Sequence, residues 1–139
     1  MLAPASARAD ELDGAVLAGG TVDAVGGAGW WAAAEAWFGA HGARVDAFGE
    51  RGAVLLEGSY QVMAGNAWPN LVAGAHIGGG ADVRGRPVAP VVAAGGELLV
   101  GLGLPRPLAL AARFDAHCLF RDGTPYFYVT VSLGIGAAF

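Results

Sequence analysis

The last thirteen residues of the chain read Phe127-Tyr-Val-Thr-Val-Ser-Leu-Gly-Ile-Gly-Ala-Ala-Phe139. Every odd-numbered residue of this stretch is apolar, and the residues between them are small or carry a hydroxyl group. Strict alternation with a period of two is typical of a β-strand with one apolar face and one polar or crowded face. The stretch therefore predicts a strand that runs from Phe127 to the last residue.

The composition favours a membrane protein built from strands. The chain has 139 residues, enough for one domain, and 24 of them are glycine. Charged residues make up only 14%, and the mean hydropathy is +0.48. Its longest segments with few charges, 58–81 and 87–107, are interrupted by prolines and glycines, whereas a membrane helix needs about 20 predominantly apolar residues. Transmembrane strands fit better, because half of each such strand faces a polar interior.

The same alternation divides the rest of the chain into strands separated by turn residues. Glycine, proline and asparagine stand at nearly every boundary, as hairpin turns require. An even number of strands brings both termini to the same end of a barrel. We therefore predict an all-β fold, an eight-stranded antiparallel up-and-down transmembrane β-barrel over residues 10–139. Its strands are expected at 12–22, 29–38, 43–48, 53–63, 71–83, 88–104, 108–120 and 127–139.

The charged residues inside these strands keep to one face, and the opposite face is apolar. A soluble barrel would carry its charges on the outside, so this pattern is inverted and predicts a polar network in the lumen. The residues expected in that network are Glu35, Arg44, Asp46, Glu57, His76, Glu97, Arg113, Asp115 and His117.

Folding the strands into hairpins predicts which charges meet. Folding about the turn near Pro105 sets Glu97 opposite Arg113. The hairpin around residues 50–51 sets Arg44 opposite Glu57, and the one around residues 86–87 sets His76 opposite Glu97. Opposite charges that meet across strands are favourable, so we expect ion pairs that plug a narrow lumen.

With this strand pattern, these inward charges and an aromatic last residue, the chain resembles small eight-stranded bacterial outer-membrane β-barrels of the OmpA/OmpX-like class. The resemblance implies location in the bacterial outer membrane, contact with its lipid and lipopolysaccharide, and a monomer. It also implies that the outer-membrane assembly machinery reads the last strand through Phe127, Val129, Val131, Leu133, Ile135 and Phe139. Such barrels carry aromatic girdles, to which we assign Trp30, Phe38, Tyr60, Phe114, Phe120, Phe127 and Phe139.

The first nine residues differ from the rest. The sequence Ala7-Arg-Ala9 followed by Asp10 has the form of a signal-peptide cleavage site with an acidic mature start. We therefore interpret residues 1–9 as the remnant of a signal peptide or a disordered tail.

The strand pattern gives little support for a catalytic or metal-binding site. A hydrolase triad of Asp115, His117 and Ser132 or Ser59 is conceivable, but His117 is expected to point into the lumen and is followed two residues later by Leu119. We expect no cofactor and no metal, because a full strand separates His76 from His117. With a net charge of −4 and no basic run, we expect no nucleic-acid partner.

We therefore expect a non-catalytic barrel with a structural or envelope-interaction role. A lipid A-modifying barrel enzyme and a soluble lipocalin-like ligand-binding barrel are the alternatives. Small inward residues leave space for a thin path that would permit weak ion leakage at best: Gly74, Gly78, Gly95, Gly101 and Gly134.

Overall fold

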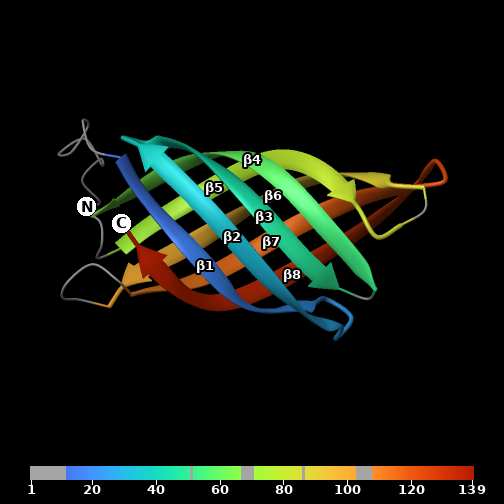
Figure 1. The fold of residues 1–139 in the computed structure, drawn as a ribbon, viewed down its shortest axis with the longest axis horizontal. Coiled ribbons are helices and arrows are strands. Elements are labelled where there is room, and N and C mark those ends of the chain that lie inside the picture. The colour runs from blue at the N-terminus through green and yellow to red at the C-terminus, as the bar shows by residue number, and fades with distance from the viewer. Residues whose placement is uncertain (1–11, 51, 67–70, 86, 103–107) are drawn as a thin grey trace.

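The computed structural model describes residues 12–50, 52–66, 71–85, 87–102 and 108–139. They form a closed barrel in which each of the eight strands pairs antiparallel with its neighbours in sequence and β8 closes on β1 (Figure 1). The predicted all-β up-and-down barrel is confirmed. Residues 1–9, interpreted as a signal-peptide remnant or tail, lie outside the described residues.

Every strand end lies within three residues of its predicted position, and two turns are shorter than predicted. Between β2 and β3 the turn is only Gly39 and Ala40, because Gly39 adopts a positive φ of 61°; His41 and Gly42, predicted in the turn, belong to β3. The turn between β7 and β8 is Asp122 and Gly123, with φ of 52° and 75°, the left-handed pair that a two-residue hairpin turn needs. The strands are β1 (Leu12–Asp23), β2 (Ala28–Phe38), β3 (His41–Glu50), β4 (Ala53–Asn66), β5 (Leu71–Asp82), β6 (Ala89–Gly101), β7 (Ala109–Arg121) and β8 (Thr124–Ala138).

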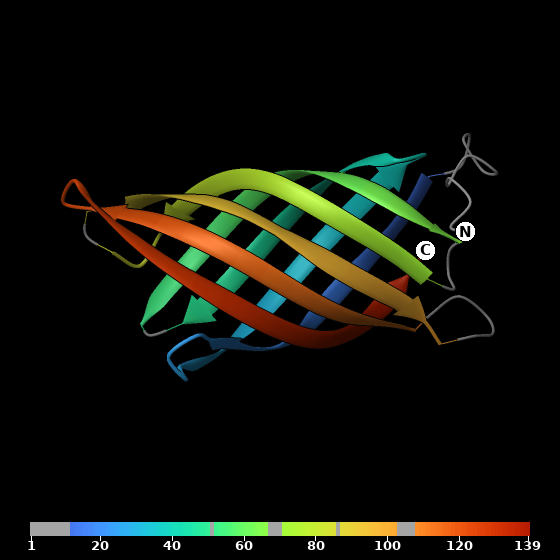
Figure 2. The ribbon, with the colours of Figure 1, turned by 180° about the vertical axis from the view of Figure 1, so that it is seen from behind.

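The strands are strongly staggered, and this sets the width of the barrel. Following register partners once around the sheet from Leu12 leads back to β1 at Val22, ten residues further along. Such a stagger tilts the strands against the barrel axis, as both views show (Figures 1 and 2). A barrel of eight strands has an interior just wide enough for side chains to fill.

The barrel has two distinct ends. The start of β1 and the end of β8 lie at one end, which we call the terminal end, and the β1–β2, β3–β4, β5–β6 and β7–β8 connections lie at the other, the far end (Figures 1 and 2). This arrangement follows from the even number of strands.

The inside and the outside of the barrel differ sharply in chemistry. Apart from Arg121 at the end of β7, every Asp, Glu and Arg whose side chain is described in a strand is buried. The interior also packs apolar groups such as Trp31, Phe48 and Leu55. Large apolar side chains project outward from all eight strands, among them Val16, Trp30, Val45, Leu56, Ile77, Val92, Leu110, Phe114, Val131 and Leu133.

The seam between β8 and β1 closes on the last residue. Gly14 and Phe139 exchange both backbone hydrogen bonds, at 2.9 and 3.0 Å. The Phe139 ring lies over Gly14 so closely that a Cβ at this position would come within 2.3 Å of Cζ of the ring and within 2.6 Å of the Glu35 carbonyl oxygen. Gly14 is therefore a steric requirement of barrel closure.

This contact predicts that Gly14→Val lowers the free energy of unfolding by about 1–3 kcal/mol, the usual cost of overpacking. Urea titration of the refolded protein in detergent micelles measures it. Gly20→Val is the matched control, because Gly20 is exposed on the same strand and its nearest Cβ neighbour would be 3.9 Å away. Equal losses in the two variants would show that the Phe139 ring does not require a glycine at position 14.

Candidate functional site

The polar network inside the barrel is the candidate functional site. All nine residues predicted for it point inward, and none is more than 7% exposed. Their alternation along β2 to β7 places them there, since inward residues follow one another at every second position. The members are Glu35 on β2, Arg44 and Asp46 on β3, Glu57 on β4, His76 on β5, Glu97 on β6, and Arg113, Asp115 and His117 on β7.

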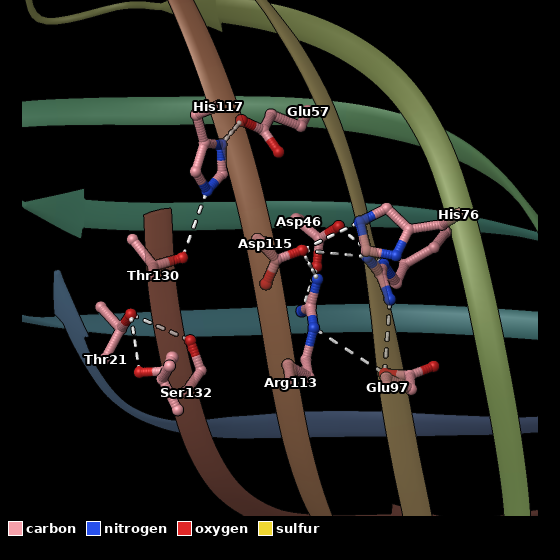
Figure 3. A network of polar contacts seen from close by, with 12 residues as sticks. Thr21, Asp46, Glu57, His76, Glu97, Arg113, Asp115, His117, Thr130 and Ser132 are labelled. Carbon is pink, nitrogen blue, oxygen red and sulfur yellow. Dashed lines mark hydrogen bonds and ion pairs between the residues drawn. The ribbon is translucent and has the colours of Figure 1, made fainter. Parts of the chain in front are cut away.

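Two arginines and two aspartates form the centre of the network. Asp46 accepts from Nε of Arg44 at 2.7 Å and from Nη1 of Arg113 at 2.6 Å. Asp115 lies 3.1 Å from Nη2 of Arg113 and 3.6 Å from Nη2 of Arg44. The four side chains, which we call the arginine ring, alternate in charge and link β3 to β7 across the lumen. Figure 3 shows Arg113 between the two carboxylates.

Glu97 and His76 extend the ring toward β6 and β5. The predicted register of Glu97 opposite Arg113 is confirmed, and Oε2 of Glu97 lies 3.3 Å from Nη1 of Arg44 and 3.8 Å from Nε of Arg113. The prediction of His76 opposite Glu97 is wrong, because His76 faces Gly95 and its Nε2 lies 2.9 Å from Asp115.

An early turn after β5 explains the shift. The Asp82 carboxylate accepts a hydrogen bond from the Arg84 backbone N–H at 3.1 Å, a local contact typical of turn initiation. The hairpin is therefore centred one residue earlier than predicted, and every cross-strand partner moves by two positions.

The predicted Arg44–Glu57 pair is also wrong. Arg44 faces Ser59, and Glu57 faces Asp46 across the β3–β4 hairpin. Gly52 carries the positive φ of this turn, 79°, so the hairpin is centred one residue later than predicted. Placing Glu57 beside Asp46 alone would be repulsive, and Glu57 instead finds its partner on β7.

That partner is His117. Its Nδ1 lies 2.7 Å from Oε1 of Glu57, and its Nε2 lies 3.3 Å from Oγ1 of Thr130 (Figure 3). Tyr128 stacks on the imidazole with 4.9 Å between ring centroids, and Phe48 meets it edge-on at 5.0 Å. The imidazole is thus held on all sides.

The residues considered for a hydrolase triad are not brought together. Asp115 contacts His76 and the arginines, while Ser132 donates to Oγ1 of Thr21 at 2.9 Å. Glu57, His117 and Thr130 do have the acid–base–hydroxyl order of such a site. Thr130 is nevertheless 0% exposed, and its hydroxyl has no open approach.

Aromatic side chains complete the packing around the ring. The Arg113 guanidinium lies 4.7 Å from the centroid of Trp31 and 5.5 Å from that of Phe48, which offsets part of the cost of burying its charge. Sequence reasoning missed these two aromatics. The alternation of β2 and β3 places both side chains on the inward face, but nothing in the sequence of one strand indicates which distant cation they contact.

Side chains of other strands occupy the space at three of the five lumen glycines. A Cβ at Gly95 would lie 2.8 Å from Cε1 of His76, and one at Gly134 would lie 2.6 Å from Cζ2 of Trp31. Met63 fills the corresponding space at Gly74. At these positions, glycine makes room for a large side chain of another strand.

A second group of polar residues surrounds the lumen at the far end. Arg121 and Asp82 form an ion pair there at 2.9 Å. A cavity of about 370 Å³ opens beside them. Sequence reasoning left these groups out of the network because they lie at strand ends next to turns. The lining includes Asp23, Glu50, Leu119, Arg121, Tyr126 and Tyr128.

No group of three or more His, Cys, Asp or Glu side chains suited to a metal ion occurs among the described residues. The part of the chain that the structure describes contains no helix long and apolar enough to cross a membrane. Comparison of the sequence with protein-family models and with curated proteins gives no match.

The arginine ring predicts a large difference between two arginines of β7. Arg113→Met leaves two buried carboxylates short of a cation and should lower the free energy of unfolding by about 3–5 kcal/mol. Arg121→Met should cost at most about 1 kcal/mol, because the Arg121 side chain is 51% exposed. Urea unfolding in micelles compares them. Similar small losses would contradict a role of the ring in stability.

Proposed function

We propose that this chain is an integral outer-membrane β-barrel with a structural or envelope-interaction role, no catalysis, and a lumen plugged by the polar network. The observation that carries the proposal is the inversion of the barrel, with ion pairs inside and apolar side chains outside. Lipid solvates such an outer surface, whereas in water an apolar surface of this extent promotes association.

The soluble lipocalin-like barrel is the second candidate, and the same inversion counts against it. A barrel that binds an apolar ligand inside needs an apolar, open interior and a polar exterior. Here the centre of the lumen is filled by the arginine ring and by Trp31 and Phe48. The cavity at the far end is the space that a ligand would have to use in this case.

The outward aromatic residues support a membrane location. All seven residues assigned to the girdles are exposed. Phe38 and Phe139 lie toward the terminal end, while Phe120 and Phe127 lie toward the far end, as expected for two interfacial belts. Tyr60 and Phe114 depart from this pattern, since they lie in the middle of β4 and β7.

The resemblance to the OmpA/OmpX-like class carries the finer part of the proposal. It assigns the chain to the bacterial outer membrane, among lipid and lipopolysaccharide, as a monomer assembled by the outer-membrane machinery. Five of the six residues proposed as the assembly signal are exposed on the outer face, and Val129 is half-buried. An exposed face is what a recognition signal requires.

A lipid A-modifying enzyme remains an alternative with one relevant observation. His41 and Tyr60 contact each other through Nδ1 and the phenol oxygen on the outer face. No serine of the described strands shares that outer face, since Ser59 and Ser132 are both buried. The pair alone does not constitute the His–Ser arrangement of a deacylase.

A substitution in the last strand tests the membrane location. Val131→Arg should lower the free energy of unfolding in lipid vesicles by about 2–4 kcal/mol, the cost of an arginine near the bilayer midplane. Val25→Arg, in the exposed β1–β2 turn, should cost about 0–1 kcal/mol. If the purified protein is soluble and monomeric without detergent, the membrane proposal is wrong.

Shortening the last residue tests the assembly signal. Phe139→Ala should reduce the amount of folded barrel in outer membranes of cells far more than it reduces refolding in micelles. In vitro the variant loses only the ring packed over Gly14, and burial of a whole aromatic side chain is worth about 1.5–3 kcal/mol. The measurement compares heat-modifiable, folded protein in both settings. Equal losses in both would mean that Phe139 acts in closure alone.

A further inference from the structure

The charges inside the barrel do not balance. Among the described residues of the network, five carboxyl groups face two arginines and two histidines. Even with both imidazoles protonated, one negative charge is left over. The carboxyl groups of Asp46, Glu57, Glu97 and Asp115 each lie within ion-pair distance of an arginine or a histidine.

Glu35 is the one carboxyl group of the network that forms no ion pair with the two arginines or the two histidines. It is 3% exposed, and neither of its carboxylate oxygens has a hydrogen-bond partner. Arg44 is its register partner, but the Arg44 guanidinium is directed to Asp46, Glu97 and Asp115. The carboxyl group of Glu35 lies close to that of Glu97, whose Oε1 is also without a partner.

A third unpartnered side chain approaches the same place. Gln61 is 1% exposed, and neither its amide oxygen nor its amide nitrogen has a hydrogen-bond partner. Its Cγ lies 3.1 Å from where a Cβ of Gly42 would stand. Gly42 pairs with Gln61 on one side and with Trp37 of β2 on the other. The Gln61 side chain thus lies over Gly42 of β3, the strand between β4 and β2.

The site is closed on both sides along the barrel axis. The stagger of the strands brings Glu35, Gln61 and Glu97, on alternate strands, to one level of the lumen. Toward the terminal end the next large inward side chains are apolar, namely Trp37, Met63 and Leu99, each at most 3% exposed. The arginine ring lies on the other side. A net charge confined there is costly, because water cannot solvate it.

We propose that Glu35, Glu97 and Gln61 bind a monovalent hard cation, Na⁺ or K⁺, between the apolar floor and the arginine ring. Two carboxylates and an amide carbonyl are the oxygen ligands that hard cations prefer. With all five carboxyl groups ionised and both imidazoles protonated, one negative charge remains, which a single monovalent cation would balance. A divalent ion would add an excess positive charge next to two arginines. The proposal concerns the lumen alone and does not depend on the membrane in which the barrel resides.

Refolding in different salts tests the proposal, because a closed site takes up its ion as the barrel forms. The protein is refolded from urea into zwitterionic micelles in NaCl, KCl or choline chloride at equal ionic strength. The midpoint of thermal unfolding should be higher by about 5 °C in the preferred alkali salt than in choline chloride, since a ligand of the folded state alone stabilises it. The rise should saturate with salt concentration.

Two variants localise the effect. Glu35→Gln removes the excess charge, so its midpoint should be the same in all three salts. Glu57→Gln is the control, because it removes a carboxylate that pairs with His117 and should retain the dependence on the alkali ion. Crystals grown in RbCl should give an anomalous peak between the carboxyl groups of Glu35 and Glu97.

Three results would overturn the proposal. A midpoint that ignores the cation but rises as the pH falls, in wild type and not in Glu35→Gln, would show that the two carboxyl groups share a proton instead. An equal salt effect in wild type and Glu35→Gln would show general screening. If KCl is the stabilising salt, absence of the rubidium peak in a crystal with ordered Glu35 and Glu97 side chains would exclude the bound ion.

Discussion

The contact between Arg113 and Asp46 is the interaction on which the interior depends. The backbone hydrogen bonds of the sheet join neighbouring strands, whereas this ion pair, at 2.6 Å, crosses the lumen from β7 to β3. A buried ion pair of this kind contributes little net stability compared with an apolar pair of the same size. Its effect is to exclude slipped registers of the strands. A slip of one residue in any of the participating strands would turn its charges out of the lumen and its apolar residues in.

Because one-residue slips are excluded, the sequence predicted which side chains face the lumen. It did not predict several of the cross-strand pairs. The centre of the β3–β4 hairpin was predicted one residue too early, and that of the β5–β6 hairpin one residue too late. Such an error moves each cross-strand partner by two positions. Because side chains alternate with a period of two, the new partner still points to the same side of the sheet. Arg44, Glu57 and His76 therefore lie inside as predicted, although Arg44 meets neither Glu57 nor any other residue of β4 in an ion pair.

The remaining errors have a different origin, because they concern contacts across the lumen. Hairpin geometry relates only neighbouring strands, and the ten-residue stagger emerges only when all eight pairings are known. His117 meets Glu57 three strands away, and no pattern within β4 or β7 indicates this contact. Glycines mislead for the same reason. Gly95 was expected to leave space in the lumen, but the space belongs to His76 of the adjacent strand.

A filled lumen and an apolar outer face leave the ends of the barrel as the surfaces where the chain can meet polar partners. At the terminal end the apolar floor of Trp37, Met63 and Leu99 separates the network from the rim. At the far end, charged side chains reach the surface, with Arg121 half exposed above the buried Asp82. The β1–β2 and β7–β8 connections at this end are short, so the residues around the far-end cavity, rather than long loops, form the surface that an envelope partner would contact.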